Sequence, residues 1–233
     1  MLRIKIFGTS NIGLYIYATN KYILFHSAIP KNKIDLISGE LKAPYFKVDL
    51  TETLITAPFI VGNSNGILVP NIFEDYALKE LEMFAKELDV NLAVLDSKYN
   101  ALGNIIVAND NGALVSPLIP YRLKKIISDV LDVETSTITI GRFSYIGSLI
   151  VANNDKGLVA PVVKEDERLL IEDILNIKVN EGTVNGGTEF IKLGLVVNDF
   201  GVVVGEDTTG AELMNISMTF EGGLQWGRIE SRD

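Results

Sequence analysis

Few side chains in this sequence could carry out covalent chemistry. The 233 residues contain no cysteine, which removes thiolate nucleophiles, disulfides and Cys-ligated metal, and they contain one histidine, His26. A histidine beside a hydroxyl can act as the general base for a nucleophile, and Ser27 follows directly. Both residues lie in the strand-like run YILFHSAIP, however, and neighbouring side chains on a strand point to opposite faces. We therefore expect His26 to be hydrogen-bonded rather than catalytic.

Two acidic motifs look like fragments of known active sites. Asp199-Phe200-Gly201 matches the magnesium-binding triplet of protein kinases, but no kinase catalytic loop or glycine-rich phosphate loop accompanies it. The run 207–210 (DTTG) looks like one half of an aspartic-protease carboxylate pair, which needs two copies. We interpret both as turns or helix caps. Because phosphate-loop, zinc-protease and EF-hand patterns are also missing, the sequence predicts no catalytic residues, no metal site and no cofactor.

Composition limits the possible partners. The chain carries 30 acidic and 21 basic residues, a net charge of −9, and 47% of its residues are hydrophobic. This balance disfavours a protein that mainly neutralises nucleic-acid phosphates and favours a basic partner. No run approaches the roughly 18–20 apolar residues that cross a membrane, and the first residues do not resemble a signal peptide. We expect a cytoplasmic protein.

An internal repeat is the strongest signal. An apolar–small–Asn triplet starts at positions 61, 107, 151 and 196, as Val61-Gly62-Asn63, Val107-Ala108-Asn109, Val151-Ala152-Asn153 and Val196-Val197-Asn198. Each is followed by a glycine and an apolar run; the glycines are Gly66, Gly112, Gly157 and Gly201. The stretch IYATNKYILF has the same outline, with Lys21 in the glycine position, and is predicted to be the first copy. Such a period implies a repeat architecture.

Each repeat is predicted to form a ββαβ unit of about 45 residues. The Asn/Gly turn predicts a hairpin, and the spacing of Leu123, Ile127 and Leu131 predicts a helix that begins near Pro120. A short strand-like run follows the helix. An apolar–Gly pair precedes most triplets, as in Leu102-Gly103, Ile146-Gly147 and Leu193-Gly194.

Five units account for almost the whole chain. We predict a single α/β (α+β) domain over about 1–225, with units at about 1–50, 51–97, 98–141, 142–187 and 188–225, and a tail at 226–233. The fifth unit has little room for a full helix and is expected to close the array. Because an open stack would expose sheet edges, we predict a five-fold pseudosymmetric ring with strands near the axis and helices outside.

Three stretches carry a resemblance to a known family. GNSNGILVPN (62–71), ALGNIIVANDNGALVSP (101–117) and GTVNGGTEFIKLGLVVNDFGVVVGEDTT (182–209) resemble the translation initiation factor 6 family in its archaeal form. The resemblance runs over about residues 3–220. It implies the pentein fold, a five-fold β/α-propeller of ββαβ repeats. It also implies a non-enzymatic, monomeric factor that binds the intersubunit face of the large ribosomal subunit and sterically prevents joining of the small subunit.

The same resemblance implies a partner and candidate contact residues. The main contact would be a basic ribosomal protein beside the sarcin–ricin loop, with a minor rRNA contact. Asn63 and Asn104 match family positions near the ribosome-facing surface, and Gly62 and Gly103 present them. Eukaryotic members of the family carry basic residues next to Asn63, whereas this chain has Ser64. The alternative is a guanidino-group-modifying enzyme of the same fold, which is disfavoured because its nucleophile is a cysteine.

Overall fold

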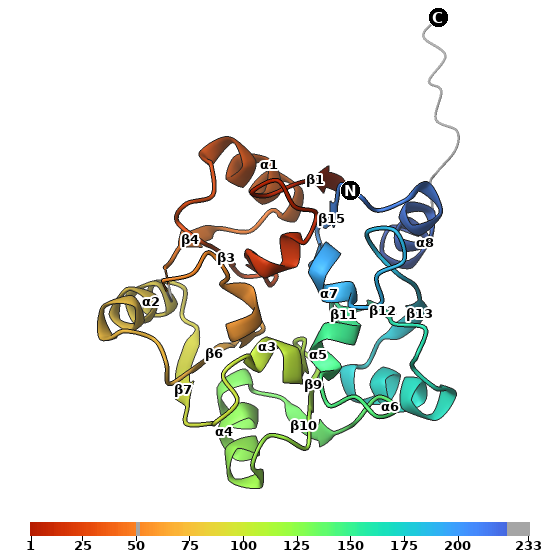
Figure 1. Ribbon diagram of the computed structural model, residues 1–233. Helices are drawn as coiled ribbons and strands as arrows, with labels where there is room; N and C mark the ends of the chain where they lie inside the picture. Colours follow the sequence, from red (N-terminus) through yellow and green to blue (C-terminus); the bar gives the residue numbers. More distant parts are fainter. Residues whose placement is uncertain (50–51, 223–233) are drawn as a thin grey trace, which may run out of the picture.

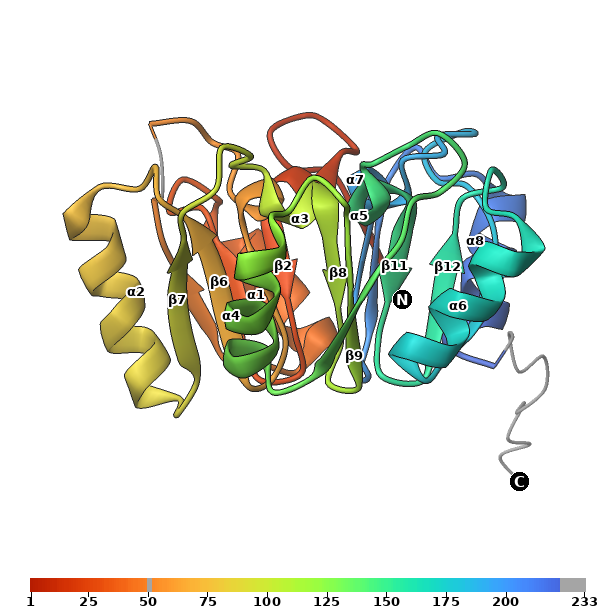
Figure 2. The ribbon, with the colours of Figure 1, turned by 90° about the horizontal axis from the view of Figure 1, so that it is seen from below.

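The computed structural model describes residues 1–49 and 52–222. Five three-stranded sheets stand around a central axis, and the long helices form an outer ring (Figures 1 and 2). The five-fold α/β ring predicted from the repeat is thereby confirmed. The predicted tail at 226–233 lies outside the described residues.

Each unit follows the same element order: a short helix, an inner strand, a middle strand, a long outer helix and an outer strand. The first unit has η1 (Ile12–Leu14), β2 (Ile16–Ala18), β3 (Ile23–Phe25), α1 (Lys31–Leu41) and β4 (Tyr45–Lys47). The second has η2 (Ala57–Phe59), β5 (Val61–Gly62), β6 (Gly66–Pro70), α2 (Asp75–Glu87) and β7 (Asn91–Leu95). The third has α3 (Leu102–Ile105), β8 (Ile106–Ala108), β9 (Gly112–Val115), α4 (Tyr121–Leu131) and β10 (Glu134–Thr137).

The last two units repeat this order with one exception. The fourth has α5 (Ile146–Leu149), β11 (Ile150–Ala152), β12 (Lys156–Val159), α6 (Glu165–Leu175) and β13 (Lys178–Glu181). The fifth has α7 (Ile191–Gly194), β14 (Leu195–Val197), β15 (Val202–Gly205) and α8 (Gly210–Phe220), and its outer strand is β1 (Leu2–Ile4) from the start of the chain.

The ring closes within this fifth sheet. β1 runs parallel to β15, with Arg3 opposite Val204, so the first strand of the chain completes the last unit. The Met1 ammonium lies 2.8 Å from the Glu40 carboxylate and 2.9 Å from that of Glu221, which ties the N-terminus to the ends of two helices. The expectation that the fifth unit lacks a full helix is wrong. α8 has 11 residues, because the strand that follows the helix in other units comes here from the opposite end of the chain.

Within every sheet the middle strand pairs antiparallel with the inner strand and parallel with the outer one. In the third unit, Val107 of β8 lies opposite Leu114 of β9, and Ser136 of β10 lies opposite the same leucine. The long helix is therefore a crossover connection between parallel strands, as such strands require. The inner strands β2, β5, β8, β11 and β14 each have one unpaired edge, which faces the axis.

The long helices hold neighbouring units together. Leu123, Ile127 and Leu131 of α4 are buried in one cluster with Leu68 and Leu95 from the sheet of the preceding unit. Each fully buried side chain of this size contributes about 1.5–3 kcal/mol. The helix predicted from these spacings is confirmed, with Pro120 as its N-cap. Because every helix bridges two sheets, no unit has a core of its own.

The start of α8 is fixed by one carboxylate. Glu212 accepts hydrogen bonds from the Thr209 backbone at 2.7 Å, the Thr183 hydroxyl at 2.7 Å, and the Gly186 and Gly187 amides at 3.0 and 2.8 Å. Burial acts to raise the pKa of Glu212, but these hydrogen bonds outweigh it and lower the pKa to about 2. The carboxylate thus joins the helix to the loop before α7.

We expect the Glu212→Gln variant to lose part of the acid sensitivity of the wild type. A carboxyl whose pKa is lowered by folding stabilises the folded state above its unfolded pKa and loses that effect as the pH falls toward the folded value. Between about pH 4.5 and about pH 2, the free energy of unfolding should therefore fall less steeply for Glu212→Gln than for wild type. Urea unfolding across this range measures the difference, with Glu189→Gln as the control, because Glu189 is exposed and its carboxylate makes no hydrogen bond within the described residues.

Candidate functional site

The two mouths of the central channel are chemically different. The turns between inner and middle strands form one face of the ring, the turn face. The helices η1, η2, α3, α5 and α7 form the other, the short-helix face, of which α3, α5 and α7 are labelled in Figure 2. Each inner strand runs from the short helix to the turn. Asn104, in α3, and Asn63, after β5, therefore lie on opposite faces.

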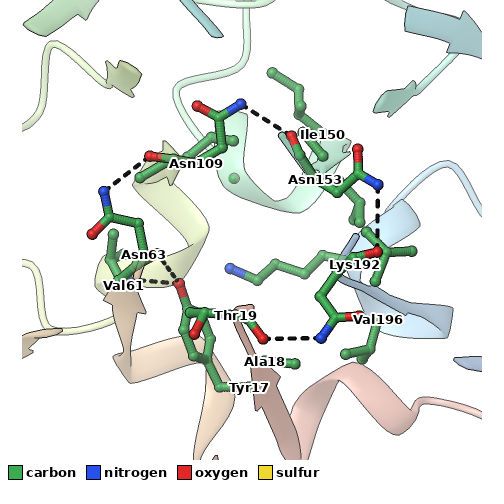
Figure 3. Close-up of a pocket in the computed structure, with 18 of the residues that line it drawn as sticks. Tyr17, Ala18, Thr19, Val61, Asn63, Asn109, Ile150, Asn153, Lys192 and Val196 are labelled. Atoms are coloured by element: carbon green, nitrogen blue, oxygen red, sulfur yellow. Dashed lines mark hydrogen bonds between the residues drawn. The ribbon is translucent and has the colours of Figure 1, made fainter. Parts of the chain in front are cut away.

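On the turn face, asparagine side chains link each unit to the next (Figure 3). The Asn63 Nδ2 donates to the Asn109 carbonyl at 3.0 Å, Asn109 to Asn153 at 3.0 Å, Asn153 to Asn198 at 3.4 Å, and Asn198 to Thr19 at 3.0 Å. The remaining step is made differently: the Tyr17 hydroxyl, from the same unit as Thr19, donates to the Gly62 carbonyl at 2.7 Å and accepts from its amide at 2.6 Å.

The same carboxamides perform two further tasks. The Asn109 Oδ1 accepts from the backbone amides of Asn111 and Gly112, both at 3.0 Å, which shapes the hairpin turn. Its Nδ2 also donates to the Leu175 carbonyl, the last residue of α6, at 2.8 Å. Asn63 and Asn198 make the equivalent bonds. Only a carboxamide supplies an acceptor and two donors at once, which explains the recurring asparagine.

The first unit uses threonine and tyrosine in this turn. The Thr19 hydroxyl accepts from the amides of Lys21 and Tyr22, and the Thr19 amide donates to the Tyr22 carbonyl, just as Asn63 pairs with Gly66. Tyr22, not Lys21, therefore occupies the predicted glycine position. In the fourth unit the position belongs to Lys156, one residue before Gly157, because the Asn153 amide donates to Lys156.

Two of the predicted contact residues are thereby assigned to the interior. Asn63 is 2% exposed, and its carboxamide makes four hydrogen bonds. A Cβ on Gly62 would lie 2.1 Å from the Tyr22 hydroxyl, so the glycine is required by packing. This pair lies on the opposite face of the ring from Gly103 and Asn104, and the contact role of Gly62 and Asn63 stays a prediction. The fold itself uses this pair.

The Asn109→Asp substitution should destabilise the ring strongly. A carboxylate keeps the acceptor but loses both donors, and it places a charge beside the carbonyls of Asn153 and Leu175. Leaving these buried groups unpaired should cost about 2–4 kcal/mol of unfolding free energy. Chemical denaturation measures this, with Asn91→Asp as the control: Asn91 also donates to a carbonyl, that of Val130, but is exposed and should lose much less.

A second polar ring surrounds the mouth on the turn face. Asp110 accepts from the Ser64 amide at 2.7 Å, and Asp199 accepts from the Asn154 amide at 2.9 Å. The Asp199 amide donates in turn to the Asn20 side chain at 2.8 Å. The kinase-like Asp199-Phe200-Gly201 is thus a hairpin turn, as expected. Both carboxylates are occupied in holding neighbouring turns together.

At the other mouth the short helices converge on the axis. The second residues of the five helices, 45, 45, 44 and 45 positions apart, are Gly13, Pro58, Gly103, Gly147 and Lys192. A Cβ on Gly147 would lie 2.2 Å from the Gly103 carbonyl oxygen, and one on Gly103 would lie 2.7 Å from that of Ile60. The small residues are therefore required by close backbone contact.

Lys192 is the residue that sequence reasoning missed. The predicted pair Leu193-Gly194 is wrong by two positions, because α7 begins at Ile191 and its second residue is the lysine. Gly194 instead packs against Asn185. The signal that could have found it is the constant spacing from Gly103 and Gly147, which points to position 192.

Gly147→Ala tests the contact of the short helices. The added methyl group must displace backbone atoms of α3, so we expect a loss of about 1–3 kcal/mol of unfolding free energy. Gly39→Ala is the matched control, because Gly39 lies in α1 with no atom within 4 Å of an added Cβ. That substitution should stabilise the protein by about 0.5–1 kcal/mol. Equal effects of the two substitutions in thermal unfolding would contradict the close packing at the axis.

Side chains that the fold does not use gather on the short-helix face. Asn104 is half-buried and makes no side-chain hydrogen bond within the described residues. It lines a pocket of about 210 Å³ together with Leu14, Pro58, Ser148, Phe190 and Lys192. The N-caps Tyr145 and Phe190 are 56% and 46% exposed, and Phe7 is 39% exposed on the turn that follows β1. The face thus combines exposed aromatic rings with a free carboxamide.

The remaining catalytic candidates have structural partners. The His26 Nδ1 accepts from the Ala28 amide at 3.0 Å, and its Nε2 faces the Asp49 carboxylate at 3.4 Å. The Ser27 hydroxyl donates to Asp49 rather than to the histidine. His26 and Ser27 therefore form no nucleophile–base pair, as expected.

The 207–210 motif is also structural. Thr209 is the N-cap of α8, and Asp207 pairs with Lys5 at 3.0 Å. Within residues 1–49 and 52–222, no three His, Asp or Glu side chains group around a possible metal ion. In the same part of the chain, every helix is too short or too polar to cross a membrane.

These features define a pentein ring whose turn-face mouth holds the fold together and whose short-helix face carries the unused polar and aromatic side chains. The family model of the eIF-6 family matches residues 1–219. The chain therefore belongs to the eIF-6 family.

Individual relatives support this membership. Translation initiation factor 6 of Nitrosopumilus maritimus is 42% identical, over 94% of this chain and 98% of that protein. The factor of the same name from Aeropyrum pernix is 40% identical over 96% of each. These relatives are named as initiation factors, so the chain is a translation factor rather than an enzyme. Among solved structures, DDAH from Pseudomonas aeruginosa in complex with citrulline is similar with a TM-score of 0.49 and 10% identity, over 73% of this chain and 68% of that one.

Proposed function

We propose that this protein binds the large ribosomal subunit on its intersubunit face and prevents the small subunit from joining by occupying the space that it needs. The observation that carries the proposal is membership of the eIF-6 family over residues 1–219. Blocking of this kind needs no bond-making step. It needs a rigid body of sufficient size, and a closed ring whose units share their cores supplies one.

The short-helix face is the proposed docking face. It includes Gly103 and Asn104 from the predicted contact set, and its aromatic side chains are of the type enriched at protein interfaces. On the turn face, by contrast, Asn63, Asp110 and Asp199 are engaged in hydrogen bonds between units.

The proposed direct partner is a basic ribosomal protein, with at most a minor contact to rRNA. A chain with a net charge of −9 is repelled by exposed phosphates and attracted to a basic protein surface. Complementary charges of this kind raise association rates and select among partners more than they raise affinity.

Asn104→Arg tests the docking face and the sign of the partner's charge together. A long cationic side chain at the mouth should clash with the partner and repel it. We expect binding to purified large subunits to weaken at least about tenfold. Co-sedimentation with large subunits and the yield of joined ribosomes are the two measurements.

Asp155→Arg is the matched control, since it introduces the same side chain at an exposed position of the turn face. It should bind like the wild type. If Asp155→Arg weakens binding and Asn104→Arg does not, the docking face has been assigned to the wrong mouth. If the wild type neither co-sediments with large subunits nor lowers the yield of joined ribosomes, the proposed function is wrong.

A further inference from the structure

A small cavity lies inside the channel between the two mouths. Its volume is about 100 Å³, and its wall is formed by the inner strands of all five units. Its lining is divided about equally between polar groups and apolar side chains such as Ile16, Ile106 and Val151. Among the described residues that line it, the titratable side chains are Tyr17, Asp110 and Lys192.

Lys192 brings an ammonium group into this cavity. It is the one long side chain at the second position of the short helices, and it points from α7 toward the middle of the channel (Figure 3). Its Nζ donates to the Gly103 carbonyl at 2.7 Å and lies 5.8 Å from the centre of the Tyr17 ring. Within the described residues it has no ion pair and no second hydrogen bond, so two of its three donors are free.

The other charged and titratable groups do not neutralise this ammonium. Asp110 lies at the turn end of β8 and is bonded to Ser64 and Asn154. The Tyr17 hydroxyl is bonded to Gly62, and burial raises its pKa, so it stays neutral. The helices that pack against α7, η1 and α5, carry no titratable side chain. Burial alone lowers the pKa of Lys192 to about 8, which shows that its charge is poorly compensated.

Backbone amides also face the axis, at the asparagine end of the inner strands. In an antiparallel pair, hydrogen-bonded residues alternate along the strand. The Asn109 amide donates to Gly112 across the turn, so the amide of Ala108 points to the free edge of β8 that faces the axis. For the same reason, the backbone amides of Ala152 in β11 and Val197 in β14 point to the free edges of their strands. In β5 the equivalent amide, that of Gly62, is the one that bonds to Tyr17.

We infer that the central cavity binds a small monovalent anion, of the size of chloride, beside the Lys192 ammonium. The two free donors of the Lys192 ammonium provide its ligands. The single positive charge selects against phosphate and other more highly charged anions. Because the edge carbonyls face the axis as well, the anion belongs at the lysine end of the cavity rather than at the asparagine end.

Chlorine-35 NMR line broadening tests this inference on the intact protein. Chloride exchanging with a protein site broadens the bulk signal, and the half-saturation concentration reports affinity. We expect Lys192→Met to raise that concentration at least about tenfold. Lys21→Met is the matched control, because the Lys21 Nζ also donates to a backbone carbonyl, that of Asp89, but at an exposed position. It should bind chloride like the wild type.

A measurement on the wild type keeps the test independent of any variant. An anion at Lys192 must stabilise the protonated amine. The pKa of Lys192, followed by NMR of its Cε, should therefore be higher in chloride than in gluconate at equal ionic strength, and broadening should disappear well above that pKa. An unchanged Lys192 pKa, or equal broadening by wild type and a folded Lys192→Met, would overturn the inference. Ribosome binding is read separately, so neither result decides the proposed function.

Discussion

The structure depends on a carboxamide that bonds in four directions. At Asn109, one side chain shapes its own hairpin through its oxygen and holds both the neighbouring turn and the end of the neighbouring helix through its nitrogen. The link between units is thus made by the same group that forms the turn within a unit. Since each helix also shares its core with the preceding sheet, the five units cannot be ordered independently of one another.

At the mouth on the short-helix face, the constraint is steric. Glycine at positions 13, 103 and 147 lets the short helices touch backbone to backbone near the axis. The fifth helix departs from this rule with Lys192, whose side chain enters the space that the small residues leave. The five-fold symmetry is thus broken once at each mouth, by Thr19 and Tyr17 at the turns and by Lys192 at the short helices.

The repeat, the helices and the ring could be predicted because their signals are local. The turn bonds join residues two or three positions apart, and the stripe of Leu123, Ile127 and Leu131 follows from helical geometry. Three features had no such signal. The register of the first turn depends on a threonine hydroxyl replacing a carboxamide, so Lys21 was assigned instead of Tyr22. Lys192 is missed because Leu193-Gly194, two positions after Ile191-Lys192, also fits the apolar–Gly pair that begins most of the other short helices. Burial of Asn63 depends on its bonds to the carbonyls of Asn109 and Leu131, which lie 46 and 68 positions away in the sequence.

The pairing of β1 with β15 has a consequence for the order of events as the chain is made. The strand containing Arg3 is synthesised first, yet its partner, around Val204, follows some two hundred residues later. Until β15 has been made, β1 has no partner strand, and the first four units form an open ring. Contacts between residues so far apart in the sequence slow folding, and this one can form only late. The ring can therefore close only after β15, in the last unit, has been made and has paired with β1.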